Sequence, residues 1–264
     1  MSLDKTLQIQ IGDQFHTLTS DDDYLTQLGQ HFEPHMCKLF LALLEKNHVV
    51  LDIGANIGCT TILFAQNARE VISFEPSPTT FKYLQLNIRR ANFRNVQLHN
   101  VGLGTQDEDL TLTFAATNRA GAFVSNQTPA SAGHIVENIH IKRGDSYIKS
   151  TRVDFIKIDV EGFERDVLRG LTDTIRRNRP TVVSELNHWC LNAFQRISIP
   201  DYFDYLLSVF PILYAVDGDT YLDLHDANHR YSVMYHHILH FKYPNLVGAF
   251  DSAQLARMLL DFHQ

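Results

Sequence analysis

Two acidic residues and one histidine stand at positions where proton transfer could occur. Asp159 follows an apolar run over residues 153–158, and Glu185 follows another over residues 181–184. Both runs are typical of buried strands, and the carboxyl ends of parallel strands meet at one edge of a sheet. We therefore expect both carboxylates to face one cleft, where they could accept a proton from a hydroxyl group. His188 is the base we prefer if no metal binds, because its ordinary pKa of about 6.5 lies near neutrality.

The same region offers oxygen ligands for a hard cation. Asp159 and Glu185 could bind Mg²⁺ or Ca²⁺ together with the amide of Asn187, because both cations prefer oxygen atoms. A cation there could hold two substrate oxygens and acidify one of them. Glu161, at the start of the following helix, is a candidate contact to the substrate. The alternative is that these acids hydrogen-bond the amino group of a cofactor or cap helices.

Histidine is frequent in this chain, with 14 residues among 264. His134, in the middle of the chain, is a second choice for a base. Five more gather towards the C-terminal end: His225, His229, His236, His237 and His240. Two of them have the i, i+4 spacing of a helical metal pair, but the sequence lacks the H-E-x-x-H pattern. We therefore expect this group to contact substrate, to lie at an interface or to lie on the surface.

The elements that must position these residues alternate between strands and helices. We predict strands over residues 49–52, 71–74, 96–100, 153–158 and 181–184. Amphipathic helices are predicted over residues 57–66, from about 79, and around 163–171. Repeated units of this kind predict an α/β fold in which a parallel sheet carries helices on both faces. Residues 110–152 break the pattern with an extended piece and a loop rich in small residues, which predicts a lid or substrate loop.

One domain accounts for the whole chain in this interpretation. Residues 1–46 form an N-terminal helical cap, 47–185 a cofactor-binding core, and 186–264 the C-terminal part of the sheet and the substrate side. Within the cap we predict a helix near residues 36–44, and the acidic run at 21–23 predicts a solvated helix start. Later in the chain we predict a helix over 202–209, a strand over 212–216 and a helix over 255–262, and we leave 234–241 open between strand and helix.

A glycine-containing turn, D-I-G-A-N-I-G at residues 52–58, joins the first of these strands to the first helix. Glycines let the backbone turn tightly and let a ligand approach it closely. Glu75 ends the next strand, 21 residues after Gly54. A carboxylate at that position can accept both hydroxyl groups of a ribose. The two features together predict a nucleoside-containing ligand at the carboxyl ends of the strands.

Two classes of cofactor use such a turn. A dinucleotide needs the pattern G-x-G-x-x-G, but here Asn56 and Cys59 occupy the second and third glycine positions. Asp52 lies directly before the turn, and its charge would repel a pyrophosphate by about 1 kcal/mol or more at an effective dielectric constant near 20. S-adenosylmethionine carries an ammonium and a sulfonium group and no phosphate. Asp52 therefore favours S-adenosylmethionine.

Four motifs in series resemble one known family. D-I-G-A-N-I-G is followed by F-E-P-S-P at residues 74–78, N-V-G-L-G at 100–104 and I-K-I-D-V-E-G-F-E at 156–164. This series is similar to the FkbM-type family of S-adenosylmethionine-dependent class I methyltransferases, from about residue 49 to 185. The resemblance implies a Rossmann-like fold whose mostly parallel sheet has seven strands, the last of them antiparallel. It also implies methyl transfer, usually to a hydroxyl group of a sugar or another molecule.

The resemblance further implies roles for individual residues. Those implied at the cofactor are Asp52, Gly54, Asn56 and Gly58 at the methionine end, Glu75 at the ribose, and Asn100, Val101 and Gly102 beside the adenine. Asp159 is a further candidate contact to the cofactor, because it ends a predicted strand and so faces the same cleft. The stretch at residues 118–121 resembles an Asn- and Gly-containing stretch of the family. Asn118 in it could recognise sugar hydroxyl groups.

We expect a cytosolic O-methyltransferase that acts on a sugar, a glycolipid precursor or a glycosylated natural product. One alternative is a methyltransferase with a non-sugar small-molecule acceptor. Another is a non-catalytic protein that binds an adenosine ligand. A dinucleotide-dependent oxidoreductase is the third, which Asp52 and Asn56 disfavour.

Composition and charge exclude several other classes of protein. Hydrophobic residues make up 44% and charged residues 20%, as in ordinary globular proteins. The formal net charge of −7 argues against a nucleic-acid partner. No apolar run approaches the about 20 residues of a membrane span, and the first residues lack the plan of a secretory signal. Three dispersed cysteines, Cys37, Cys59 and Cys190, favour a reducing compartment. A homo-oligomer is left open.

Overall fold

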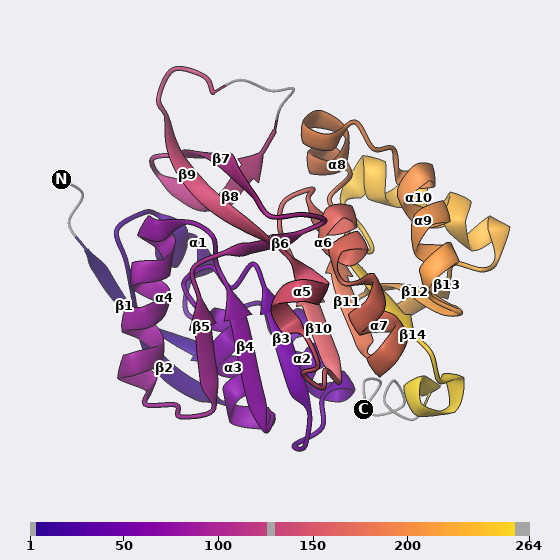
Figure 1. Cartoon of the computed structure of the whole chain (residues 1–264), viewed down its shortest axis with the longest axis horizontal. Coiled ribbons are helices and arrows are strands. Elements are labelled where there is room, and N and C mark those ends of the chain that lie inside the picture. Colours follow the sequence, from indigo (N-terminus) through magenta and orange to yellow (C-terminus); the bar gives the residue numbers. More distant parts are fainter. Residues whose placement is uncertain (1–3, 126–129, 257–264) are drawn as a thin grey trace.

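A large mixed sheet forms the centre of the protein (Figure 1). The computed structural model describes residues 4–125 and 130–256. The sheet has eight strands in the order β13-β12-β14-β11-β10-β3-β4-β5. Their bounds are Val49–Ile53 (β3), Glu70–Phe74 (β4), Val96–His99 (β5), Phe155–Ile158 (β10), Thr181–Glu185 (β11), Ile212–Asp217 (β12), Thr220–Asp223 (β13) and Asn245–Ala249 (β14).

Strand direction follows the predicted Rossmann-like arrangement. Strands β5, β4, β3, β10 and β11 pair in parallel, while β14 runs antiparallel to both β11 and β12. The predicted seven-stranded sheet with an antiparallel last strand is therefore confirmed. The short strand β13 adds an eighth member by pairing antiparallel with the edge strand β12. Strands β3 and β10 are buried along their whole length, as is usual when helices cover both faces of a parallel sheet.

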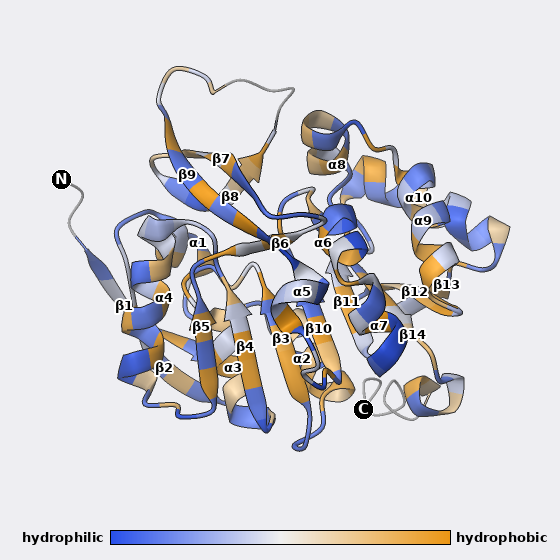
Figure 2. Ribbon diagram, viewed as in Figure 1, coloured by the Kyte–Doolittle hydropathy of each residue, from blue (hydrophilic) through white to orange (hydrophobic). Residues whose placement is uncertain are grey.

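Helices cover both faces of this sheet. On β3, Val50 points into one hydrophobic core and Leu51 into the other, because successive side chains of a strand alternate between faces. Figure 2 shows the hydrophobic residues concentrated in the central strands. The helices that follow β3 along the chain are α3 (Cys59–Asn67), α4 (Pro78–Ala91), α5 (Gly144–Ile148), α6 (Glu164–Gly170), α7 (Thr172–Asn178), α8 (His188–Gln195), α9 (Ile199–Val209) and α10 (Ala227–His240).

Two predictions concern the C-terminal part of the chain. Residues 234–241, left open between strand and helix, belong mainly to α10. The predicted helix over residues 255–262 lies almost wholly outside the described residues. Within the described part of the chain, no helix combines the length and the apolar character needed to cross a membrane.

The N-terminal region contains a β-hairpin as well as helices. Strands β1 (Lys5–Ile11) and β2 (Gln14–Ser20) pair antiparallel, and α1 (Tyr24–Leu28) and α2 (Pro34–Leu43) follow them. The expectation of a purely helical cap over residues 1–46 is therefore corrected. Ile9 and Ile11 are buried at the two-residue period of a strand, and the hairpin turns at Gly12, whose φ is +63°. This alternation next to a Gly-Asp pair was the sequence signal for the hairpin.

A second sheet replaces the irregular loop expected over residues 110–152. Its strands, in the order β6-β9-β7-β8, are β6 (Gly102–Gly104), β7 (Glu108–Ala115), β8 (Asn118–Val124) and β9 (His134–Arg143). Leu112, Phe114, Ile139 and Ile141 form a small core of their own. This inserted sheet lies above the carboxyl ends of the central strands (Figure 1). It forms a wall beside the predicted cofactor region.

Candidate active site

A cleft opens where the central strands end and the inserted sheet begins. Gly54, Asn56 and Glu75 line it from the ends of β3 and β4, and Leu112 and Ile139 line it from the inserted sheet. A second, smaller cleft continues on the other side of the turn, under the loop between α1 and α2. Both clefts share Gly54, Asn56 and Asp159. The glycine-containing turn therefore divides one elongated binding region.

Close packing between two strand ends fixes the shape of this turn. Gly54 has a φ of +81°, and a Cβ atom on it would lie 1.8 Å from the carbonyl oxygen of Asp159. Gly58 has a φ of +102°, and a Cβ there would lie 2.9 Å from Leu84. Neither position accommodates a side chain without distortion. The predicted tight turn is present, and its closest approach at Gly54 is to the backbone of the neighbouring strand β10.

Asp52 does not face the ligand region. Its side chain has an exposed fraction of 0% and accepts hydrogen bonds from Thr60 Oγ1 at 2.9 Å and Thr61 Oγ1 at 2.6 Å. Its Oδ1 also lies 3.5 Å from Nζ of Lys157. The carboxylate is thus turned into the protein and paired with a cation. This corrects our expectation that Asp52 borders the methionine end and decides the cofactor by its own charge.

Lys157 was not singled out from the sequence. It lies in the fully buried strand β10 and donates a hydrogen bond of 2.7 Å to the carbonyl oxygen of Gly54. Its Nζ is also 3.5 Å from Asp159 Oδ2. Burial lowers the pKa of Lys157, but Asp159 and Asp52 outweigh that effect and raise it above its ordinary value. A lysine inside the apolar run F-I-K-I was the signal that could have revealed it, because a buried lysine requires a partner.

Glu75 borders the larger cleft and holds the turn in place. Its carboxylate accepts hydrogen bonds from the backbone N–H groups of Asn56 at 3.0 Å and Ser77 at 2.9 Å. The side chain is nearly buried, and this burial raises the pKa of Glu75 to about 7 although both N–H groups act in the opposite direction. Each oxygen keeps a further lone pair for a ligand.

The three residues expected beside the adenine have different positions. The amide of Asn100 donates to the carbonyl oxygens of Glu75 at 2.9 Å and Pro76 at 3.1 Å, so it ties two strand ends together. Gly102 lines the cleft, next to Leu103. Val101 packs against a hydrophobic core and does not line the cleft. Within this trio, only Gly102 keeps the predicted role of bordering the ligand region.

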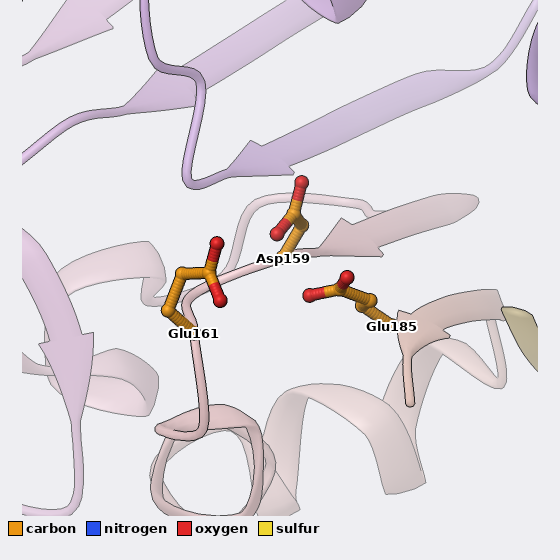
Figure 3. Close-up of side chains that lie close together, drawn as sticks. All are labelled: Asp159, Glu161 and Glu185. Carbon is orange, nitrogen blue, oxygen red and sulfur yellow. The ribbon is translucent and has the colours of Figure 1, made fainter. Parts of the chain in front are cut away.

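Three carboxyl groups converge beside the turn (Figure 3). One oxygen from each of Asp159, Glu161 and Glu185 lies within 4.8 Å of the others. Glu161 adopts a φ of +51° and Gly162 a φ of +100°, which folds the loop after β10 back on itself. The convergence predicted for Asp159 and Glu185 is therefore present, and Glu161 joins it. We refer to these three residues as the carboxylate cluster.

Crowding changes the acidity of the carboxylate cluster. Burial raises the pKa of Glu161 to about 7, and repulsion from Asp159 adds to this. Burial, Asp159 and Glu161 together raise the pKa of Glu185 well above its ordinary value. The negative charges of the neighbouring carboxylates thus add to burial in disfavouring ionisation of Glu161 and Glu185.

Asn187 supports the carboxylate cluster with its NH₂ group. Its Oδ1 accepts a hydrogen bond from the backbone N–H of Cys190 and caps α8, while its Nδ2 donates to Glu161 Oε2 at 3.2 Å. The Cys190 thiol also donates to Glu161 Oε2, at 3.1 Å. Asn187 therefore presents a donor to the cluster, which corrects its expected role as an oxygen ligand for a metal.

His188 points towards α10. Its ring lies 5.0 Å from the rings of His237 and Phe241, and burial lowers its pKa. His134 pairs with its own loop, where its Nδ1 accepts a hydrogen bond from the backbone of Ser131. Neither histidine proposed as a base lines the two clefts, although Nδ1 of His188 is buried without a hydrogen-bond partner among the described residues.

Arg119, rather than Asn118, lines the larger cleft. Asn118 uses its Oδ1 to accept a hydrogen bond from the backbone N–H of Ala120. The Arg119 guanidinium pairs with both oxygens of Asp21, with 2.8 Å between Nη2 and Oδ2, and its backbone N–H donates to Asp22 at 2.9 Å. The acidic run at residues 21–23 does precede a helix, because Asp23 is the N-cap residue of α1, but Asp21 and Asp22 are bound to Arg119 instead of being solvated. It joins the N-terminal hairpin to the inserted sheet.

The C-terminal histidines are not gathered around a metal-sized space. Four of the five lie on α10, where His237 is fully buried and its Nδ1 lies 2.7 Å from the carbonyl oxygen of Lys242. Among residues 4–125 and 130–256, the carboxylate cluster is the one group of three or more acidic, histidine or cysteine side chains close enough to share a cation.

The profile of the FkbM methyltransferase domain matches residues 52–220, which include the turn, Glu75 and the whole carboxylate cluster. The chain belongs to the FkbM methyltransferase family. The resemblance expected from the four motifs is confirmed, and the match extends beyond residue 185. This FkbM-family chain is 29% identical over 188 residues to Methyltransferase 1 of Beauveria bassiana, covering 63% of this chain and 76% of that relative.

Another relative of this FkbM-family protein is the hexuronic acid methyltransferase AglP of Haloferax volcanii. The two are 29% identical over 147 residues, which cover 54% of this chain and 58% of AglP. A crystal structure of an FkbM methyltransferase from Methylobacillus flagellatus KT superimposes with a TM-score of 0.46 and 21% identity. That superposition covers 65% of this chain and 42% of the other.

Proposed function

We propose that this FkbM-family protein transfers the methyl group of S-adenosylmethionine to a hydroxyl group of a saccharide or a saccharide-bearing small molecule. The observation that carries this proposal is the carboxylate cluster next to the glycine-containing turn. Donor binding at the turn would bring a reactive methyl group close to groups able to accept a proton. Asp159 lines both clefts and links the two features.

The two clefts suit the two ends of the donor. On one side, Glu75 offers a carboxylate for the ribose hydroxyl groups, and Gly102 and Leu103 offer a close, apolar surface for the adenine. On the other side, Glu33 lines the smaller cleft. Its carboxylate could pair with the ammonium of the methionine part. The turn between them would lie beside the sulfonium.

Charge favours this donor over a dinucleotide, although through different residues than the sequence suggested. Asp52 is buried and paired with Lys157. The acids that line the two clefts are Glu33, Glu75, Asp159 and Glu161. A pyrophosphate would meet these acids and be repelled, whereas an ammonium and a sulfonium would be attracted.

Transfer needs alignment and a proton acceptor. The acceptor oxygen forms a bond to the methyl carbon while the carbon–sulfur bond breaks and its electrons return to sulfur. The hydroxyl proton passes to a carboxylate of the cluster. Glu161 is well matched to this role, because a base with a pKa near the working pH is the most effective. Asp159 and Glu185 would share the proton with it.

A saccharide is the acceptor class with most support. The relative AglP is named for methylating hexuronic acid. The mouth of the larger cleft combines apolar residues of the inserted sheet, such as Ala122 and Val124, with Arg119. A sugar ring has both apolar faces and hydroxyl groups and suits such a lining.

Two measurements test the proposal. Calorimetry should detect binding of S-adenosylhomocysteine and weak or no binding of NADH. Mass spectrometry should then detect methylated product when S-adenosylmethionine is supplied with a panel of uronic acids, neutral hexoses and non-sugar alcohols. Tight NADH binding without S-adenosylhomocysteine binding would overturn the donor. Donor binding with methylation of the non-sugar alcohols alone would overturn the saccharide acceptor.

A further inference from the structure

We propose that Asp159, Glu161 and Glu185 together bind one hard divalent cation. Binding itself needs only the geometry of the carboxylate cluster. Its use in methyl transfer rests on the proposed function. The three ligands come from the end of β10, the loop after it and the end of β11, so the central sheet fixes two of them (Figure 3).

Separation between the oxygens fits the coordination shell of such an ion. The three oxygens lie within 4.8 Å of one another. Ca²⁺ binds oxygen at about 2.4 Å, so two ligands on opposite sides of the ion lie about 4.8 Å apart. Mg²⁺ binds oxygen at about 2.1 Å, which places opposite ligands about 4.2 Å apart. Carboxylate oxygens are the ligands that both ions prefer.

Glu185 provides a separate indication that a ligand is missing from the cluster. Its Oε2 is inaccessible to water and has no hydrogen-bond partner among the described residues. The side chain points towards Asp159 and Glu161 (Figure 3). A buried oxygen without a donor is unfavourable, and native proteins rarely leave one in that state. A cation between the three carboxylates would satisfy it.

The balance of charges around the carboxylate cluster also favours binding of a cation. Lys157 is 3.5 Å from Asp159 Oδ2, but the same ammonium pairs with buried Asp52 and donates to the carbonyl oxygen of Gly54. One lysine thus serves two aspartates, and the described residues place no further ion pair on Glu161 or Glu185. The cluster therefore has an excess of acidic groups over cations.

Surrounding residues hold Glu161 in position for this role. Asn187 Nδ2 and Cys190 Sγ both donate to Glu161 Oε2, which leaves Oε1 for the cation. The left-handed backbone at Glu161 is uncommon for a residue with a side chain. The next residue, Gly162, packs so closely that a Cβ would lie 2.9 Å from the backbone of Cys190. Asn187 and Cys190 are positioning residues, of the kind that orient metal ligands in other proteins.

The chemical consequence follows from the location. A cation bound between the strand ends would accept the acceptor hydroxyl oxygen as a further ligand and lower the pKa of that hydroxyl group. The cation would then take over this task from Glu161, whose carboxylate would hold the ion, and the hydroxyl proton would pass to water. It would also fix a second oxygen on the neighbouring carbon if the acceptor is a diol. This predicts a preference for saccharides that carry adjacent oxygens.

Manganese provides a direct probe, because Mn²⁺ has the same ligand preference and is paramagnetic. The purified full chain, without cofactor, is titrated with MnCl₂ and free Mn²⁺ is followed by electron paramagnetic resonance. One Mn²⁺ should bind per chain. Asp159→Asn, Glu161→Gln and Glu185→Gln should each weaken binding by more than about tenfold. Asp166→Asn, which removes one charge from nearby helix α6, should leave the affinity unchanged.

Further measurements separate this inference from the proposed function. Calorimetry with S-adenosylhomocysteine on the same preparations reports the donor site alone. A chain that binds S-adenosylhomocysteine but no Mn²⁺ overturns the cation site and leaves the methyl donor standing. A chain that binds Mn²⁺ but no S-adenosylhomocysteine retains the cation site and overturns the donor. Equal Mn²⁺ binding by all variants also overturns the site, because the ion would then lie elsewhere.

Two more results bear on the identity of the ion and on the positioning role. CaCl₂ and MgCl₂ should both displace Mn²⁺, and the order of their affinities identifies the preferred ion. Asn187→Ala should weaken Mn²⁺ binding by about tenfold and broaden the spectrum of the bound ion. Asn187→Ser should restore part of the helix cap but not the bond to Glu161. Full Mn²⁺ affinity in both variants would show that Asn187 does not position Glu161 for the cation.

Discussion

Nζ of Lys157 lies 2.7 Å from the carbonyl oxygen of Gly54. This hydrogen bond joins the buried strand β10 to the glycine-containing turn that follows the neighbouring strand β3. The same ammonium lies 3.5 Å from Asp52 and 3.5 Å from Asp159. A single buried cation therefore holds the turn, neutralises the aspartate beneath it and reaches the residue that borders both clefts. The rigidity of the proposed donor site depends on this lysine.

Replacement of Lys157 by methionine should destabilise the protein strongly. Methionine fills a similar volume but leaves Asp52 buried without its cation. Removing one partner of a buried ion pair costs about 3–5 kcal/mol. Urea unfolding followed by circular dichroism measures the loss. Lys142→Met, which breaks an exposed pair with Asp107, is the matched control and should hardly change the midpoint. Equal midpoints for both variants would contradict the structural role of Lys157.

Alanine at Gly54 should be far more harmful than its backbone conformation alone explains. The added Cβ would lie 1.8 Å from the carbonyl oxygen of Asp159. Either the sheet separates at this point or the turn moves, and S-adenosylhomocysteine binding should then be lost. Gly218→Ala is the control, because Gly218 also has a positive φ, of +54°, but open space around it. Backbone strain of this kind costs about 1–3 kcal/mol. Similar melting temperatures for the two variants would show that the clash is absent.

Loss of the Glu75 carboxylate should weaken donor binding. Glu75→Ala removes the acceptor for the ribose hydroxyl groups and leaves the N–H groups of Asn56 and Ser77 without their partner. Hydrogen bonds to a charged group contribute about 1.5–3 kcal/mol. We therefore expect about 10- to 100-fold weaker binding of S-adenosylhomocysteine in calorimetry. Glu70→Gln, at the opposite end of β4, is the control and should bind S-adenosylhomocysteine with unchanged affinity. If Glu75→Ala binds S-adenosylhomocysteine with unchanged affinity, Glu75 does not bind the ribose.

Stability should fall as pH rises through neutrality, partly because of Glu164. This side chain is fully buried, and burial raises its pKa from 4.5 to about 7. A raised folded-state pKa gives full stability below the unfolded-state value and loses it as pH rises through the folded-state value. The contribution of Glu164 between pH 4.5 and 7 is at most about 3 kcal/mol.

Glu164→Gln isolates this effect. Glutamine keeps an oxygen for the N–H groups of Val160 and Gly162, to which Glu164 Oε1 is bonded at 3.2 and 3.1 Å. It cannot ionise, so the difference in unfolding free energy between pH 5 and pH 8.5 should shrink relative to the original chain. Urea titrations at the two pH values measure that difference. An unchanged pH dependence would show that Glu164 ionises freely in the folded protein.

Several features were predictable because they depend on local pattern. Buried strands appear as short apolar runs, and the parallel order follows from the helices between them. Asp159 and Glu185 come together because each directly follows a strand that lies beside the other in the sheet. The alternation of apolar and polar residues in residues 5–11 also indicated the N-terminal hairpin, but the hairpin was not among our predictions.

The sequence alone determined the turn and the parallel direction of the central strands, since each rests on spacing within one or two neighbouring elements. The family resemblance, carried by four short motifs, implied the antiparallel last strand. Tertiary structure decided where the side chains point. Asp52 turns away from the ligand because Thr60, Thr61 and Lys157 bind it first. Glu161 joins the carboxylate cluster from a loop with a left-handed backbone, where its carboxylate accepts a hydrogen bond from Cys190 on a later helix. Such contacts join residues far apart in the chain, and only the packing of whole elements brings them together.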